Sequence, residues 1–254
     1  YVFDYLNINY IERPSSIFES GRIEKIESAF LFGNPLFSVS ENEIEQKETS
    51  KVRSGISPLP FTEKEISNLN TILSKNGIKT VSTNLESSSE DMLYKHSKSN
   101  LIHIATHGFY IEEEKNNRFN WGLLATGSKD IISKDFQKTP RNDGIIFGAE
   151  IMNKNFTNTE LVILSACETG FGKSTFLGSE NLSNSFLRAG AKNIISTLWP
   201  VDDETTNIFM TNFYRELLRS KNIKESLRKT KAELKKDFPH PNYWAPFVLT
   251  INKI

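Results

Sequence analysis

The feature that most constrains this chain is an alternation of short apolar runs with segments of helical periodicity. Runs such as Leu101–Ala105, Leu161–Ser165 and Asn193–Leu198 are five or six residues long, which is the usual length of a buried strand. The segments between them repeat apolar side chains every three or four residues, as amphipathic helices do. Strands that alternate with covering helices form a mostly parallel sheet. We therefore predict an α/β fold with a mostly parallel six-stranded sheet and helices on both of its faces.

The bounds of these elements follow from where each pattern begins and ends. The expected strands are 29–32, 77–81, 101–105, 161–165, 193–198 and 246–251. The expected helices are 61–75, 87–97, 181–189, 204–220 and 223–235. A further short strand is expected at 121–125, at the edge beside the site, within the otherwise polar stretch 111–144. Residues 38–58 are polar and lack periodicity, so we expect a surface loop or an insertion there.

Charge, cysteine content and hydropathy restrict the class of protein. The 31 basic and 31 acidic side chains cancel, so no net field favours nucleic acid or a membrane surface as a partner. No apolar stretch approaches the roughly 18 residues that a bilayer span needs. One cysteine cannot form a disulfide within the chain, which favours a reducing compartment, and we expect a cytoplasmic location. The chain does not begin with Met, so we expect 1–254 to be a single domain from the C-terminal part of a longer protein.

The single cysteine, Cys167, stands where a parallel sheet presents a nucleophile. It directly follows the run 161–165 and Ala166, and it precedes a turn that contains glycine. His107 and Gly108 follow the run 101–105 in the same way, and open α/β sheets place their sites at the carboxyl ends of their strands. A neighbouring imidazole favours the thiolate, which is the attacking species. With the backbone N–H groups of Gly108 and Cys167 as an oxyanion hole, these residues predict a cysteine peptidase.

Structural interpretations compete with this one. Taken alone, a cysteine after a buried strand is most often a small core residue, and a histidine at a strand end is most often held by its neighbours. Because Cys167 and His107 both lie at strand ends, a catalytic role for the pair is favoured over core packing. The stretch 172–174 ends like a phosphate-binding loop but lacks the loop's first glycine, and His103 with His107 has the spacing of a zinc pair but lies on a strand. We therefore expect no nucleotide, metal or other cofactor.

Longer stretches of the sequence resemble the CHAT domain, a caspase-like domain found with tetratricopeptide repeats. The wider group includes caspases, separases and gingipains. The matching stretches cover nearly the whole chain: 32–35 (FGNP), 103–108 (HIATHG), 144–151, 161–172 (LVILSACETGFG), 186–191 (FLRAGA), 196–203 (STLWPVDD), 213–214, 227–228 and 243–247 (YWAPF). The resemblance implies a caspase-like fold and a His–Cys dyad, and only His107 and Cys167 fall on the dyad positions. No third catalytic side chain is required. The chain departs from the family at 176–178, where a Gly-acid-Gly pattern is usual.

Two adjacent acids, Asp202 and Asp203, open the predicted helix 204–220. As an N-cap and an acidic first turn they would stabilise the helix without any substrate. In separase-like relatives, an acidic residue in this loop receives a basic side chain at the residue before the cut bond. The resemblance therefore implies that Asp202 and Asp203 bind Lys or Arg of a substrate, and both interpretations remain open.

The resemblance also implies how such a chain would be controlled. Caspases are activated by cleavage between the strand of the nucleophile and the next strand, but here 170–192 is short and is already assigned to a loop and a helix. We expect a protein substrate and control by a fused or bound partner, either a helical-repeat region or an effector complex, with no direct role for nucleic acid or membrane. Some relatives act in prokaryotic defence. A catalytically silent interaction module and another thiol-dependent acyl transferase are the alternatives.

Overall fold

The predicted central sheet is present in the computed structural model, which describes residues 21–23, 25–37, 59–110, 120–128, 143–165, 173–175 and 178–252. Its six strands lie in the order β11-β10-β7-β3-β1-β2. They are β1 (Ser28–Gly33), β2 (Lys79–Ser82), β3 (Leu101–Ala105), β7 (Leu161–Ser165), β10 (Asn193–Thr197) and β11 (Phe247–Ile251). Neighbouring strands are parallel except for β10 and β11. The prediction of a mostly parallel six-stranded sheet is confirmed.

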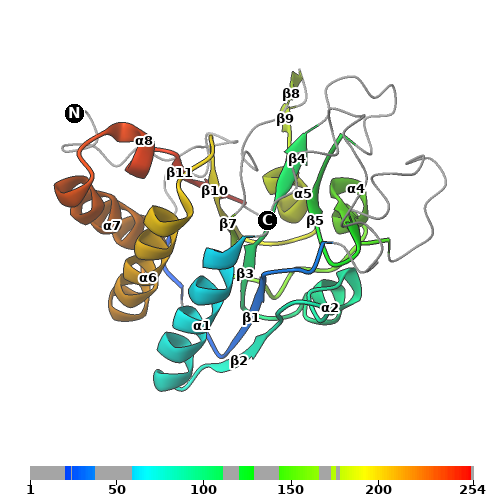
Figure 1. The fold of residues 1–254 in the computed structure, drawn as a ribbon, viewed down its shortest axis with the longest axis horizontal. Coiled ribbons are helices and arrows are strands. Elements are labelled where there is room, and N and C mark those ends of the chain that lie inside the picture. Colours follow the sequence, from blue (N-terminus) through cyan, green and yellow to red (C-terminus); the bar gives the residue numbers. More distant parts are fainter. Residues whose placement is uncertain are drawn as a thin grey trace, which may run out of the picture.

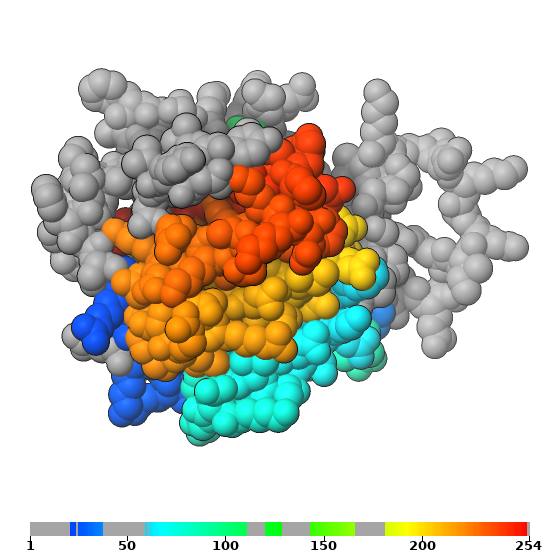
Figure 2. All heavy atoms as spheres, turned by 90° about the vertical axis from the view of Figure 1, so that its left-hand side faces the viewer, coloured from blue at the N-terminus to red at the C-terminus, as the bar shows by residue number. Residues whose placement is uncertain are grey.

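Helices cover both faces of this sheet (Figure 1). One face carries α1 (Pro60–Lys75), α6 (Asp203–Ser220), α7 (Ile223–Asp237) and α8 (Pro241–Trp244). The other carries α2 (Glu90–Lys95), α4 (Gly148–Met152) and α5 (Leu182–Arg188). Figure 2 shows α6 lying between α1 and α7 across the surface of the first face. The expected helices are thus present, within a few residues of their predicted ends.

The strands divide the interior into two apolar cores because successive side chains point to opposite faces. Leu101 and Ile163 belong to the core beneath α1, α6 and α7. Ile102 and Leu164 pack in the core beneath α2, α4 and α5. Every residue of β3 and β7 is buried, as expected for central strands of a sheet covered on both faces. This arrangement fixes which face each polar side chain on β3 and β7 can reach.

A second, antiparallel sheet follows β3 directly in the chain. It contains β4 (Gly108–Tyr110), β5 (Trp121–Leu124) and β6 (Ile145–Phe147), with β5 in the centre. The strand predicted at 121–125 therefore exists, but its predicted place at an edge was wrong. Its partners β4 and β6 are three residues long, too short to give a periodic signal. The expected loop at 38–58 lies outside the described residues.

A hairpin follows β7 in the chain. Its strands are β8 (Lys173–Thr175) and β9 (Gly178–Glu180), which pair antiparallel. The hairpin leads directly into α5. It was not predicted, because the sequence indicated only a loop and a helix at 170–192, and strands of three residues give no periodic signal.

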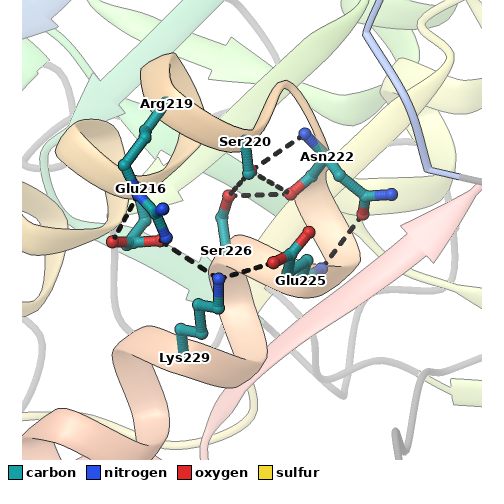
Figure 3. Close-up of polar contacts among 7 residues, drawn as sticks. All are labelled: Glu216, Arg219, Ser220, Asn222, Glu225, Ser226 and Lys229. Atoms are coloured by element: carbon teal, nitrogen blue, oxygen red, sulfur yellow. Dashed lines mark hydrogen bonds and ion pairs between the residues drawn. The ribbon is translucent and has the colours of Figure 1, made fainter.

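The turn between α6 and α7 is held by polar side chains (Figure 3). Lys221 adopts the left-handed conformation, with φ at 55°, and Asn222 caps α7 by accepting a hydrogen bond from the backbone N–H of Glu225 at 3.0 Å. Lys229 lies between two carboxylates, 2.5 Å from Glu225 and 3.9 Å from Glu216. Ion pairs on a surface contribute about 0.2–1 kcal/mol each, so these contacts add little to the stability of the fold.

Candidate active site

The strands that lead to the two predicted dyad residues are neighbours in the central sheet. β3 and β7 run parallel, and their register pairs Ala105 with Ser165 at the carboxyl ends. His107 comes two residues after Ala105, and Cys167 comes two residues after Ser165. Cys167 itself lies outside the described residues. The described part of the site therefore consists of His107, the strand end that leads to Cys167, and the side chains around them.

The backbone around His107 is tied to the small sheet. The carbonyl oxygen of His107 accepts a hydrogen bond from the backbone N–H of Leu124 at 2.9 Å. The hydroxyl of Thr106 donates to the carbonyl oxygen of Leu124 at 2.6 Å. The imidazole of His107 is half-buried and packs against Phe37, with ring centroids 5.2 Å apart. These contacts hold the imidazole at the edge of the sheet where β7 also ends.

A pocket opens beside His107, between the strand ends and the first turns of α1 and α6. Polar residues form most of its lining: Thr62, Glu65, Thr106, His107, Ser165, Thr197, Asp203 and Thr206. Apolar atoms of Leu59, Phe61 and Val201 line it as well. The strand ends and two helices thus enclose a space with polar groups and an apolar rim beside the imidazole. This is the location expected for a binding site in an α/β sheet.

The two acids at the start of α6 have different environments. Asp202 is the N-cap, and its Oδ2 accepts hydrogen bonds from the backbone N–H and the hydroxyl of Thr205, both at 2.9 Å. The capping interpretation of Asp202 is thereby confirmed, and Asp202 does not line the pocket. Asp203 does line it. Burial raises the pKa of Asp203, the negative charges of Asp202 and Glu65 raise it further, and His107 lowers it. The structure therefore brings Asp203, rather than Asp202, together with His107.

A chain of buried polar side chains lies beneath the pocket. The hydroxyl of Ser165 donates to Oε2 of Glu65 at 3.2 Å, and Oε1 of Glu65 is 2.9 Å from Nε2 of His103. The other ring nitrogen of His103 is 3.2 Å from the hydroxyl of Tyr214. Glu65 is 3% exposed, and His103 and Tyr214 are fully buried. Burial raises the pKa of Tyr214 well above its ordinary value, with a further rise from the charge of Glu65, so the phenol stays protonated.

This buried chain joins four elements that surround the candidate site. Glu65 belongs to α1, His103 to β3 and Ser165 to β7, while Tyr214 belongs to α6. From the sequence, His103 was recognised only as an unsuitable zinc ligand, and Glu65 and Ser165 were not recognised. The available signal was the position of Glu65, which shares the core-facing stripe of its helix with Leu69, four residues later. A carboxylate on that stripe must meet a polar partner.

Of the two residues predicted to form the oxyanion hole, the structure describes only Gly108. Gly108 is the first residue of β4 and is paired with Leu123 in the small sheet, directly after His107. The backbone N–H of Cys167 lies outside the described residues. The oxyanion hole stays a prediction.

Among the described residues, no group of three or more His, Cys, Asp and Glu side chains could hold a metal ion. His103 is committed to Glu65 and Tyr214 in the core. In the part of the chain that the structure describes, no helix is long and apolar enough to cross a membrane.

Comparison with known families decides the identity of the fold. The model of one family, the CHAT domain, matches residues 7–252. The chain belongs to the CHAT domain family. The resemblance inferred from the sequence motifs is therefore confirmed over nearly the whole length of the chain.

Solved structures show that this CHAT domain has a caspase-like fold. The gingipain RgpB of Porphyromonas gingivalis, solved as a complex of its pro- and mature domains, aligns with a TM-score of 0.54 at 8% identity over 89% of this chain and 47% of its own. The separase of Saccharomyces cerevisiae, solved with securin, aligns with a TM-score of 0.52 at 16% identity over 90% of this chain and 12% of its own. At such identities these likenesses establish the fold alone.

Curated relatives include tetratricopeptide repeat protein 28. The CHAT domain is 30% identical to the protein from Mus musculus and 29% identical to that from Homo sapiens, in both cases over 112 residues. The aligned part is 43% of this chain and 4% of each relative. The match therefore links this domain to a much longer repeat protein.

Proposed function

We propose that this CHAT domain is a cysteine endopeptidase that uses His107 and Cys167 as its catalytic dyad. The observation that supports this most is the register of β3 and β7, which pairs Ala105 with Ser165, two residues before each dyad position. The pocket beside His107 adds a place for a substrate side chain. The family match and the fold shared with gingipain and separase agree with this chemistry.

The proposed reaction proceeds through an acyl-enzyme. His107 favours the thiolate of Cys167, whose sulfur attacks the carbonyl carbon of the scissile peptide bond. The backbone N–H groups of Gly108 and Cys167 would donate hydrogen bonds to the oxyanion. The C–N bond then breaks, and the imidazolium of His107 gives its proton to the leaving amine. Water next attacks the thioester and gives a proton to His107, and the C–S bond breaks to release the acid and the thiol.

The substrate would be a protein with Lys or Arg before the cut bond. Asp203 lines the pocket beside His107 and is half-buried, which supports a contact between its carboxyl group and a substrate side chain. Gingipain R, an Arg-specific cysteine proteinase, has the same fold, with a TM-score of 0.52 in its crystal structure. A contribution of Asp202 to substrate binding stays part of this proposal, although its Oδ2 is occupied as the N-cap.

Control by a partner is the second part of the proposal. The match to a tetratricopeptide repeat protein supports a fused or bound helical-repeat region that acts on the domain, or an effector complex in its place. We place this activity in the cytoplasm of a prokaryote, in defence or signalling, on the basis of the single cysteine and of the family resemblance.

Covalent labelling of the cysteine tests the proposed function. The chain is incubated with peptide acyloxymethyl ketones, and adducts on Cys167 are located by mass spectrometry after digestion. We expect an adduct that is absent from Cys167→Ala and that forms at least about a hundredfold more slowly in His107→Gln. His240→Gln serves as the matched control, because His240 is exposed and caps α8 away from the pocket.

A cellular measurement separates a peptidase from an interaction module. New protein N-termini are compared between cells with the wild-type chain and cells with Cys167→Ala, each with the candidate activating partner. A peptidase produces N-termini that only the wild-type sample contains. If Cys167→Ala retains the biological output and the two samples contain the same N-termini, the domain acts as a catalytically silent module.

A further inference from the structure

The pocket beside His107 has a second carboxylate that neither the dyad nor the N-cap explains. Glu65 enters from α1, opposite the start of α6, and lines the pocket although it is only 3% exposed. A carboxylate in such a place has lost most of its hydration, so it must be compensated by partners within the protein or within a ligand. The partners present are the hydroxyl of Ser165 and the imidazole of His103.

These partners leave Glu65 only partly compensated. Oε2 accepts one hydrogen bond from Ser165. Oε1 is 2.9 Å from Nε2 of His103, but the two atoms are poorly aligned, and Oε1 makes no well-formed hydrogen bond with any described residue. A carboxylate has about four acceptor positions and Ser165 occupies one of them, so Glu65 keeps acceptor capacity.

The buried chain fixes the place of the Glu65 carboxyl group. Nε2 of His103 lies 2.9 Å from Oε1 of Glu65, and Nδ1 of the same ring is 3.2 Å from the hydroxyl of Tyr214. The floor of the pocket is therefore a carboxyl group that four elements of the fold hold in place.

The rest of the pocket suits a long side chain with a cationic end. Leu59, Phe61 and Val201 offer apolar surface to a methylene stem, which is how Lys and Arg side chains bury their carbon atoms. Glu65 from α1 and Asp203 from α6 both line the pocket, and each acts electrostatically on the other. Two carboxyl groups on separate helices match the planar guanidinium of Arg, which donates along several directions.

We propose that Glu65 is the specificity-determining residue of this pocket, binding the cationic end of Arg or Lys at the residue before the cut bond. The inference rests on the proposed peptidase function. It adds that the preference for a basic substrate side chain comes from Glu65 on α1 as well as from Asp203 at the start of α6. Ser165 and His103 are positioning residues that hold the carboxylate in place. Because Ser165 precedes Cys167 by two residues, the same carboxylate also connects the selected side chain to the strand of the nucleophile.

The test compares Arg with citrulline, which has the same length and a planar end group but no charge. Three peptide acyloxymethyl ketones that end in Arg, citrulline or Leu are used to label Cys167 in the wild-type chain, in Glu65→Gln and in Glu63→Gln. Glu63 is the matched control, because it lies on the same helix with an exposed side chain. Thermal melting of each variant accompanies the labelling rates.

We expect the wild-type chain to react faster with the Arg probe than with the citrulline probe. In Glu65→Gln this ratio should fall roughly ten- to hundredfold, which is the size expected for the loss of a hydrogen bond to a charged group, while the Leu probe reacts as before. Glu63→Gln should keep the wild-type ratio. Glu65→Asp, which keeps the charge, should retain a preference for Arg.

Three outcomes separate this inference from the proposed function. If Glu65→Gln keeps the ratio of Arg to citrulline while the Leu probe still labels Cys167, the inference is wrong and the peptidase proposal stands. If none of the three probes labels Cys167 of the wild-type chain, the peptidase proposal fails, and the inference fails with it. If Glu65→Gln does not fold, ethylguanidinium decides on the wild-type chain: it should slow labelling by the Leu probe, and an unchanged rate refutes a cation site.

Discussion

A buried carboxyl group on α2, Glu90, should make the stability of this domain depend on pH. Glu90 is 3% exposed, and its Oε2 makes no hydrogen bond with any described residue. The pKa of Glu90 is raised from 4.5 to about 8, most strongly by burial and further by the negative charges of Glu150, Asp143 and Asp91, while Lys154 lowers it. The native state therefore keeps this carboxyl group protonated at a pH where the unfolded chain has released the proton.

The size of the effect follows from the difference between the two pKa values. Between pH 4.5 and about 8 the native state binds one proton more than the unfolded chain, so the free energy of unfolding falls as the pH rises. The fall is about 1.4 kcal/mol for each pH unit, and it levels off above the native pKa. From pH 6 to pH 9 the contribution of Glu90 should amount to a loss of about 2–3 kcal/mol.

Glu90→Gln tests this reasoning, because glutamine has the shape of the protonated carboxyl group and cannot ionise. Urea denaturation at pH 6, 7, 8 and 9 gives the free energy of unfolding of the wild type, of Glu90→Gln and of the exposed control Glu86→Gln. We expect the free energy of unfolding of Glu90→Gln to exceed that of the wild type by about 2 kcal/mol at pH 6, because the unfolded wild type is already ionised there, and by about 4–5 kcal/mol at pH 9. The control should follow the wild type throughout. Parallel curves for the wild type and Glu90→Gln would refute the reasoning.

Four further substitutions test other parts of the structure. Burial lowers the pKa of Lys231 to about 8, so the native state loses this proton at a lower pH than the unfolded chain does. The free energy of unfolding should therefore rise between pH 8 and pH 10. Lys231→Met should flatten that rise and increase the free energy of unfolding by up to about 3 kcal/mol at pH 7, as measured by urea denaturation. Gly148→Ala would place a methyl group inside the ring of Trp121 and break its hydrogen bond to α5, which should cost about 1–3 kcal/mol and change the tryptophan fluorescence. Lys221→Gly should gain about 0.5–1 kcal/mol in thermal melting, because φ is 55° at this position. Asp202→Ala should cost about 1 kcal/mol by removing the N-cap, and a fall in the Arg-to-citrulline labelling ratio of this variant would add Asp202 to the substrate site.

The central sheet could be predicted from the sequence because its strands are buried on both faces. β3 and β7 have the predicted bounds, since five consecutive residues that avoid water leave little ambiguity about where a strand lies. The small sheet could be predicted only in its central strand. β4 and β6 have three residues each, and their place depends on pairing with β5, which no local pattern records.

The pocket was harder to predict than the strand ends that border it. His107 and Cys167 are recognisable in the sequence because each residue follows an apolar run and precedes a glycine. Glu65 has no such neighbours, and the other glutamate of its helix, Glu63, is exposed to solvent. What distinguishes Glu65 is its place on the core-facing stripe, where a charge is costly unless the fold compensates it. Its partners His103 and Ser165 come from strands that only the folded sheet brings together.

Asp202 and Asp203 show how the start of a helix gives two adjacent carboxylates separate roles. The N-cap residue has extended rather than helical geometry, which turns the side chain of Asp202 back over the first turn to the N–H of Thr205. Asp203 is the first helical residue and lines the pocket, where burial raises its pKa and repulsion by Asp202 and Glu65 raises it further. A cation bound between Asp203 and Glu65 would remove that repulsion and lower the pKa of Asp203. Binding of a basic side chain would therefore favour the charged form of Asp203. Asp203 and Glu65 would then bind the same cation together.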